Sequence, residues 1–377
     1  MPIFNMAAGK KGPSITIGNT SWEDTLKSIF GQSDYVSADE ALKNSDVFSL
    51  IMQLSGDLAA VDYQAKRPVT QNLLDDPSNT SNAHAFWQSM FAQLLLGGEA
   101  FAYRWRDWRG QDIKLEYLRP SQVSTMLLND GSGLIYNLAF DEPNIGIKQN
   151  VPQYDVLHFR LLSKNGGKTG ISPLSSLANE LNIKQRSNNL TLHALSQSIV
   201  APGILSVKNG SLLDNAKKAA ISNRFARQMT NSTGPIVLDD LEEYQPLEIK
   251  ADVSRLLSQA DWTSSQIAKV YGISDSYLNG AGDQQSSIKM ITDQYGRSLK
   301  RYTDAITSEL SNKFGQSITA DLRPALDPNG DDYAAKIADL RTSDVLDANQ
   351  AQEILVRTGY LPKNLPARKE EEANGGN

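Results

Sequence analysis

Residue types that commonly do chemistry are sparse in this chain of 377 residues and form no catalytic pattern. There is no cysteine, which excludes disulfides, thiolate metal sites and cysteine nucleophiles. The three histidines, His84, His158 and His193, have no carboxylate or histidine partner at the spacing of metal ligands, so we expect each to be structural. The sequence therefore predicts no metal, no cofactor and no catalytic residue.

The stretch 273–287, ISDSYLNGAGDQQSS, is a polar loop with two glycines and is the remaining candidate for a functional site. An enzyme lid or phosphate cradle is one interpretation, but the glycines do not fit G-x-G-x-x-G, no strand precedes them and the loop has no G-K-[ST]. A surface connection between two helices is the second interpretation, which spacing alone favours. A third interpretation depends on the rest of the chain.

Two helices must position this loop. Before it, apolar residues recur at steps of three and four or their sums over 253–271, with Asp252 as the expected N-cap and Gly272 as the stop. After it, the same steps continue over 288–314, which corresponds to roughly 40 Å of helix. Gly296 lies inside this second helix, where it predicts a bend or a close approach of another element.

The region 45–170 has the pattern of an α+β domain. The expected helices are 46–59, capped by Ser45 or Asp46, and 81–97, and the expected strands are 61–65, 100–105, 113–118, 123–128, 134–140 and 156–161. Pro68 is expected to close the first unit, and the strands from 100 onward to form an antiparallel meander.

Four large aromatic residues crowd this region, namely Trp87, Tyr103, Trp105 and Trp108. Such a cluster is compatible with the stacking of nucleic-acid bases. Core and hairpin packing is favoured, because Tyr103 and Trp105 share one face of a strand.

A long helix is predicted to follow, with Ser172 as N-cap, Pro173 in the first position and an end near 199. Its apolar stripe is interrupted by Lys184, Gln185 and Asn188. Such a stripe is typical of contact between subunits, although a half-exposed helix of a monomer has the same pattern.

A small βαββ unit is predicted between Pro202 and Pro246, with strands at 203–207, 236–238 and 243–249 and a helix at 212–229. The helix is basic and an acidic run follows it. The charged residues are Lys217, Lys218, Arg224 and Arg227, then Asp239, Asp240, Glu242 and Glu243. A solvated face is favoured over a nucleic-acid site, and the opposite charges suit pairing between subunits.

Composition bounds the remaining choices. The 37 basic and 43 acidic residues give a net charge of −6, so the chain is not built to grip nucleic acid over its whole surface. A channel lined by polar or acidic residues would instead let a polyanion such as DNA slide along it. The first 20 residues lack the apolar core of a signal peptide, and no run of 18 apolar residues suggests a membrane span. Two short helices are expected near 331–340 and 347–358.

Three stretches carry a resemblance to a known family. They are SQIAKVYGISDSYLNG before the loop, DVLHFRLLSKNGGKTGISPLSSLANELN at 155–182, and LLLGGEAFAYRWRDWRGQDIKLEYLRPSQV at 94–123. Their order and spacing resemble the portal proteins of tailed bacteriophages, specifically the HK97-like family, over residues 45 to 360. The segment VLDANQAQEILVRTGYLP is similar to the C-terminal element of that family, with Gln350 where glutamate is usual.

The resemblance implies a portal fold assembled as a ring. Its parts are an N-terminal, partly disordered arm (1–44), an α+β wing (45–170), a stem helix (171–200), a clip (201–250), a second stem helix (251–272), a tunnel loop (273–287), a long wing helix (288–314), a C-terminal, crown-like helical region (315–366) and a disordered tail (367–377). His158 matches a histidine often found in the family's strand before the glycine turn, which implies packing or hydrogen bonding.

The resemblance also implies roles for individual residues. The DNA-facing tunnel loop corresponds to Asn279, Gly280, Ala281, Gly282, Asp283, Gln284 and Gln285. The stem contacts between subunits correspond to Lys184, Gln185, Asn188, Leu192, Arg255, Gln259 and Trp262. Docking at the clip corresponds to the eight charged residues of the βαββ unit given above.

The implied function is a dodecameric channel at one capsid vertex for packaging and ejecting double-stranded DNA. The implied partners are the terminase large subunit, a head-tail adaptor and the capsid or scaffold protein, with no membrane. The expected location is the virion, after assembly in the host cytoplasm. Two alternatives stay open: a monomeric adaptor that binds a partner helix along the interrupted stripe, and an enzyme of unknown substrate with 273–287 as its lid.

Overall fold

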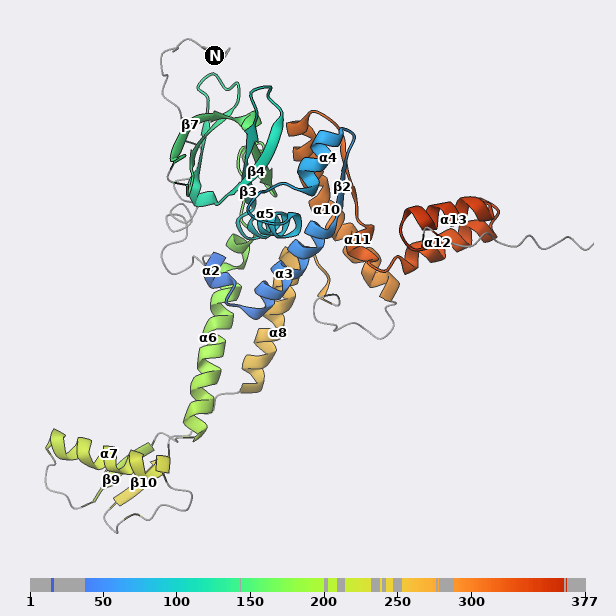
Figure 1. Cartoon of the computed structure of the whole chain (residues 1–377). Helices are drawn as coiled ribbons and strands as arrows, with labels where there is room; N and C mark the ends of the chain where they lie inside the picture. Colours follow the sequence, from blue (N-terminus) through green and yellow to red (C-terminus); the bar gives the residue numbers. More distant parts are fainter. Residues whose placement is uncertain are drawn as a thin grey trace, which may run out of the picture. The chain divides into compact units, whose positions relative to one another are not determined.

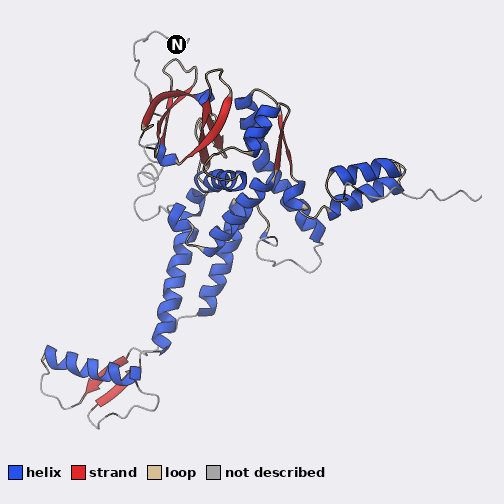
Figure 2. Cartoon of the chain, in the orientation of Figure 1, coloured by secondary structure: helices blue, strands red, loops and turns tan. Residues whose placement is uncertain are grey.

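The computed structural model describes residues 15–16, 38–142, 144–199, 203–208, 214–231, 238, 242–246, 253–275, 277, 288–362 and 364. The chain divides into two compact units (Figure 1). Unit 1 consists of Met1–Ser175 and Tyr271–Asn377, and unit 2 of Ser176–Val270. The chain therefore crosses between the units twice. Helices and strands are both present, in agreement with the predicted mixed class (Figure 2).

Unit 1 contains most of the described elements. Its N-terminal part comprises β1 (Ile15–Thr16), α2 (Ala38–Ala41), α3 (Ser45–Ala60), β2 (Asp62–Ala65), α4 (Pro68–Asp75), α5 (Ala83–Gly97), β3 (Glu99–Arg106), β4 (Asp112–Leu118), β5 (Val123–Leu127), β6 (Leu134–Ala139), β7 (Ile147–Pro152) and β8 (Val156–Arg160). Its C-terminal part comprises α10 (Ile288–Phe314), β11 (Ile318–Asp321), α11 (Arg323–Leu326), α12 (Asp331–Thr342) and α13 (Ala348–Arg357).

Several local predictions for unit 1 are wrong. The N-cap of α3 is Asn44, whose side-chain oxygen accepts from the backbone N–H groups of Asp46 and Val47 at 3.0 and 3.4 Å. Pro68 does not close a unit but begins α4, because proline is compatible with the first turn of a helix. Strands β7 and β11 and the short helix α11 were not expected.

The strands of unit 1 form three antiparallel sheets rather than one meander. The sheet orders are β4-β3-β8, β1-β5-β6-β7 and β11-β2. A 3₁₀ turn at Pro120–Gln122 separates β4 from β5, and the chain changes sheet there. One apolar cluster joins the first two sheets, with Phe101 from β3, Tyr136 from β6 and Val156 from β8 among its buried members.

Helix α5 packs on α3 and on the β4-β3-β8 sheet. Its Phe91 lies 6.2 Å from the ring of Phe159 in β8. Trp87 is buried, and Tyr103 meets Trp105 edge to face at 5.0 Å, which confirms core and hairpin packing for these three residues. The prediction is wrong for Trp108, which is 86% exposed because it lies in the tight turn between β3 and β4.

Helix α10 confirms the predicted three-four periodicity, since its buried face contains Tyr295, Leu299, Ile306 and Leu310. It packs against β8, β11 and α3. A Cβ at Gly296 would lie 2.9 Å from a methyl carbon of Leu326 in α11, so the predicted close approach is observed.

Unit 2 contains two long helices and a small sheet. Its elements are α6 (Leu174–Ile199, which begins in unit 1), β9 (Gly203–Val207), α7 (Asn215–Asn231), β10 (Glu242–Pro246) and α8 (Val253–Val270). β9 and β10 pair antiparallel. The long helices match the predicted ranges, whereas the strand predicted at 236–238 falls largely outside the described residues. No helix in the described part of the chain is both long and apolar enough to span a bilayer.

Candidate functional site

The two crossings between the units are both attached to the C-terminal end of α5. At the first crossing, the Ser172 hydroxyl donates to the carbonyl of Leu96 at 2.6 Å and accepts from the N–H of Leu174 at 3.2 Å. At the second crossing, the Tyr271 hydroxyl donates to the carbonyl of Leu95 at 3.2 Å. Carbonyls in the last turn of a helix lack intrahelical partners, so these bonds satisfy groups that would otherwise be unpaired.

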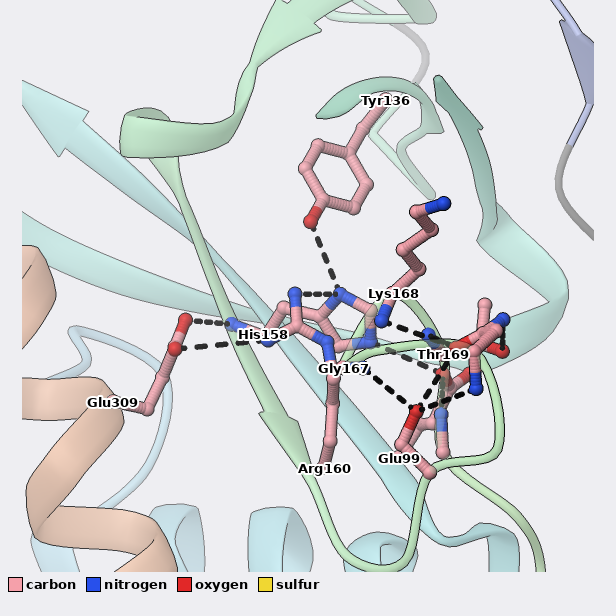
Figure 3. A network of polar contacts seen from close by, with 11 residues as sticks. Glu99, Tyr136, His158, Arg160, Gly167, Lys168, Thr169 and Glu309 are labelled. Carbon is pink, nitrogen blue, oxygen red and sulfur yellow. Dashed lines mark hydrogen bonds and ion pairs between the residues drawn. The ribbon is translucent and has the colours of Figure 1, made fainter. Parts of the chain in front are cut away.

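A buried polar network lies beside the first crossing (Figure 3). His158 is fully buried, and its Nδ1 faces the Arg160 guanidinium at 2.8 Å and the Tyr136 hydroxyl at 3.0 Å. A guanidinium has only donors, so Nδ1 is the acceptor and the ring proton is on Nε2, which faces Glu99 at 3.3 Å. Glu99 also accepts from the backbone N–H of Gly170. The network therefore joins β3, β6, β8 and the segment before α6.

The charges of this network keep His158 neutral. Burial lowers its pKa well below the ordinary value of 6.5, and the positive charges of Arg160 and Lys313 lower it further. Glu309 of α10 binds Arg160 at 3.7 Å and Lys313 at 3.4 Å, and it accepts the His158 backbone N–H at 3.2 Å. His158 is thus structural, as predicted, and the carboxylate partner that the sequence did not indicate is Glu99.

The glycine turn after β8 is held by its own side chains. The Asn165 side-chain oxygen accepts from the N–H groups of Lys168 at 3.1 Å and Thr169 at 3.0 Å, and the Ser163 hydroxyl accepts from that of Gly167 at 3.0 Å. These backbone N–H groups are already bonded within the turn, which differs from a phosphate cradle with free donors.

The two residues directly after α8, Tyr271 and Gly272, are fixed on α10. The Tyr302 hydroxyl donates to the carbonyl of Tyr271 at 2.7 Å, and the Ser298 hydroxyl donates to that of Gly272 at 2.6 Å. Farther along, the ring of Tyr277 stacks on that of Tyr295 with 3.9 Å between centroids.

The Tyr295 hydroxyl donates in turn to Asp57 of α3, whose pKa is raised by burial. The segment that enters the predicted tunnel loop is therefore held on α10. The loop residues 279–285 themselves lie outside the described residues.

The predicted stem residues that the structure describes differ in how far their side chains are exposed. Lys184 is only 8% exposed and continues the buried face of Leu177 and Leu181. The prediction that Lys184 interrupts this face is therefore wrong. Gln185, Asn188 and Leu192 are exposed, Leu192 by 64%, and Trp262 of α8 is 47% exposed. The side chains of Arg255 and Gln259 lie outside the described part of the structure.

Of the predicted clip charges that the structure describes, all but the half-buried Glu242 are exposed, and three form ion pairs within the chain. Arg224 of α7 binds Glu242 of β10 at 2.8 Å. Glu243 binds Lys208 at 2.5 Å. Lys217, Lys218 and Arg227 are exposed, and Asp239 and Asp240 are not described. The pairing expected between subunits is thus made within one chain for Arg224 and Glu242.

Neither a metal centre nor a nucleotide cradle is found in the described residues. They contain no group of three or more metal-binding side chains. A groove of about 900 Å³ lies between α10, β11, α11 and α12, but its lining is ion-paired, with Lys300 on Asp304 at 2.6 Å and Arg323 on Asp321 at 2.5 Å.

Comparison with known proteins agrees with the geometry. A sequence model of the family described as "Phage portal protein" matches residues 45–355. No curated protein matches the chain.

Three solved structures are similar. A chain of the "Virion of native gene transfer agent (GTA) particle" is 17% identical with a TM-score of 0.61 and covers 93% of this chain and 96% of its own length. A chain of the "Neck of native GTA particle computed with C12 symmetry" is 16% identical with a TM-score of 0.61, at 91% and 95% coverage. An HK97 family phage portal protein from Corynebacterium diphtheriae is 14% identical with a TM-score of 0.56, at 79% and 98% coverage. At these identities the similarity establishes the fold.

Proposed function

This chain belongs to the phage portal protein family, and on that premise we propose that it assembles into a homododecameric ring. The ring forms the channel at one capsid vertex through which double-stranded DNA is packaged and later ejected. It docks the terminase large subunit, a head-tail adaptor and the capsid or scaffold protein. The protein is a structural component of the virion, assembled in the host cytoplasm, and the energy for translocation comes from the terminase.

The observation that carries this proposal is the exposure of the described side chains in the small βαβ region of unit 2. Among the residues of this region whose side chains are described, 204–208, 214–228, 238 and 242–245, none is buried. Ile204 is 52% exposed, and the ring pair Phe225 and Tyr244, at 4.9 Å, is only partly covered. Two strands and one helix are marginal alone. Neighbouring copies would supply the missing cover.

The long helices of unit 2 support the same proposal. Ile183 and Leu190 lie seven residues apart on one face of α6 and are both exposed, as is Trp262 on α8. These side chains fit contacts between stem helices of adjacent subunits. The C12 symmetry used for the neck of the similar gene transfer agent particle is consistent with twelve copies.

The charge of the chain supports a conduit. Its net charge of −6 leaves little attraction for phosphate over most of the surface. The stacked pair Tyr277 and Tyr295 holds one end of the loop 279–285, which we place against the DNA. Replacing Gly280 and Gly282 together by Trp should block DNA packaging while leaving ring formation intact. Unchanged packaging and infectivity would exclude a DNA-facing role for the loop.

The first test of the proposal is the mass of the purified protein by light scattering, with negative-stain images of the same fraction. A closed ring has the mass of roughly a dozen chains, each of 41.3 kDa. A strict monomer at every concentration, also in the presence of scaffold protein, would refute the ring and return the adaptor interpretation.

A further inference from the structure

The end of α5 brings together two parts of the chain that are far apart in sequence. Ser172 and Tyr271 donate to the carbonyls of Leu96 and Leu95, which are consecutive residues. The first of these donors stands just before α6 and the second directly after α8. Both connections to unit 2 therefore depend on the same turn of one helix.

Close backbone contact at this point leaves no room for adjustment. Gly98 has a φ of 73°, and a Cβ there would lie 2.1 Å from the carbonyl oxygen of Ile171. A Cβ at Gly170 would lie 2.2 Å from the carbonyl oxygen of Gly98. The hydrogen bond from Ser172 to Leu96 and the two glycine contacts thus fix the backbone of 170–172 against that of 96–98.

Each crossing has a second attachment, and both lead to α10. The first runs through Glu99, which binds the N–H of Gly170 and His158, whose backbone N–H is bound by Glu309 of α10. The second is direct, because Tyr302 and Ser298 of α10 donate to the carbonyls of Tyr271 and Gly272, directly after α8. A displacement of either crossing is therefore resisted by the same two helices of unit 1.

We propose that residues 95–99, together with Ser172 and Tyr271, form a joint that couples the segment before α6 to the segment after α8. The joint holds the two crossings in fixed positions on unit 1, since they are bonded to two adjacent carbonyls of one helix. Ser172 and Tyr271 are positioning residues in this joint. The joint is a property of the single chain and requires neither the ring nor DNA, so it goes beyond the proposed function.

Hydroxyl deletions test the joint with small changes of volume. Tyr271→Phe removes only the bond to Leu95, and Ser172→Ala removes the bond to Leu96 together with the cap on Leu174. Tyr63→Phe is the matched control, because Tyr63 is also a buried tyrosine that donates to a backbone carbonyl, that of Leu58 at 3.1 Å, but within unit 1 and away from both crossings.

The readout is the distance distribution between two spin labels, measured by pulsed electron resonance. The native chain has no cysteine, so Ser132→Cys in unit 1 and Asn189→Cys on α6, both exposed, are labelled without background. Labelled chains are diluted with unlabelled chains so that each assembly carries one pair. The melting temperature of each variant is recorded alongside.

The joint predicts a broader distribution in Tyr271→Phe and in Ser172→Ala than in the parent, with Tyr63→Phe unchanged despite a similar fall in melting temperature. Unchanged distributions in both joint variants would overturn the proposal, as would equal broadening in all three variants. If Ser172→Ala does not fold, Tyr271→Phe against Tyr63→Phe decides the question alone. None of these outcomes depends on DNA packaging, so the joint and the proposed function can fail separately.

Discussion

The joint in unit 1 and the small βαβ region of unit 2 differ in how their contacts are completed. Around the joint, buried side chains such as His158, Glu99 and Ser172 find their partners within the same chain. In the βαβ region, none of the described side chains is buried, and the ion pairs lie at the surface. The contacts of the first region are made within one chain, whereas the exposed side chains of the second are the ones that we propose neighbouring copies cover.

The largest expected effect is the loss of an aromatic side chain from the core of unit 1. Phe91 is fully buried and stacks on Trp87 at 5.7 Å. Phe91→Ala should lower the free energy of unfolding by about 3–5 kcal/mol. Ile204→Ala in the βαβ region should change it by less than about 0.5 kcal/mol in the dissociated chain. Urea denaturation measures both, and a comparable loss at Ile204 in dissociated chains would abolish the contrast.

The second prediction concerns pH. Because the pKa of buried His158 is far below 6.5 when folded, only the unfolded chain binds a proton there as the pH falls past 6.5. The stability that the neutral His158 contributes is fully present above pH 6.5 and is lost as the pH falls below it. The free energy of unfolding should therefore fall by about 1.4 kcal/mol between a pH of about 7.5 and one of about 5.5. Denaturation at the two pH values measures this loss.

His158→Gln is the control for the pH prediction. The variant should lower stability at both pH values but remove this part of the pH dependence. An identical pH dependence in parent and variant would mean that His158 is not held neutral.

A smaller effect is expected at the ion pair between Arg224 and Glu242. The Arg224 side chain is 64% exposed, so Arg224→Ala should lower the free energy of unfolding by about 1 kcal/mol or less. The effect should shrink further in high salt, because exposed charges are screened. A large, salt-independent loss in dissociated chains would show that the region has a core of its own.

The smallest effect is expected at Gly296 of α10, where two opposing terms nearly cancel. Alanine raises helix propensity by about 1 kcal/mol relative to glycine. The new Cβ, however, would lie 2.9 Å from the end of the Leu326 side chain, which can shift. Gly296→Ala should therefore leave the melting temperature nearly unchanged, and Gly296→Ala with Leu326→Ala should recover the propensity gain relative to Leu326→Ala alone. A large drop in the melting temperature of Gly296→Ala would show that the Leu326 side chain does not shift at this contact.

Local patterns were predictable because they depend on near neighbours. The three-four steps of α8 and α10 identified both helices, and the order of the three resembling stretches identified the portal family. Caps were less certain, since Asn44 competes with Ser45 and Asp46 within three residues and only backbone geometry decides among them. The division of the strands between two sheets was missed, because an alternating strand does not specify its partner.

The sequence by itself determined the class of the protein, the long helices and the absence of cysteine chemistry. Only the tertiary structure showed that Lys184 is buried, that Glu99 is the partner of His158, and that Ser172 and Tyr271 meet at one helix end. Residues 172 and 271 are separated by all of unit 2, and no periodicity links them. Their meeting follows from packing on α5, whose last carbonyls lack partners until these two hydroxyls reach them.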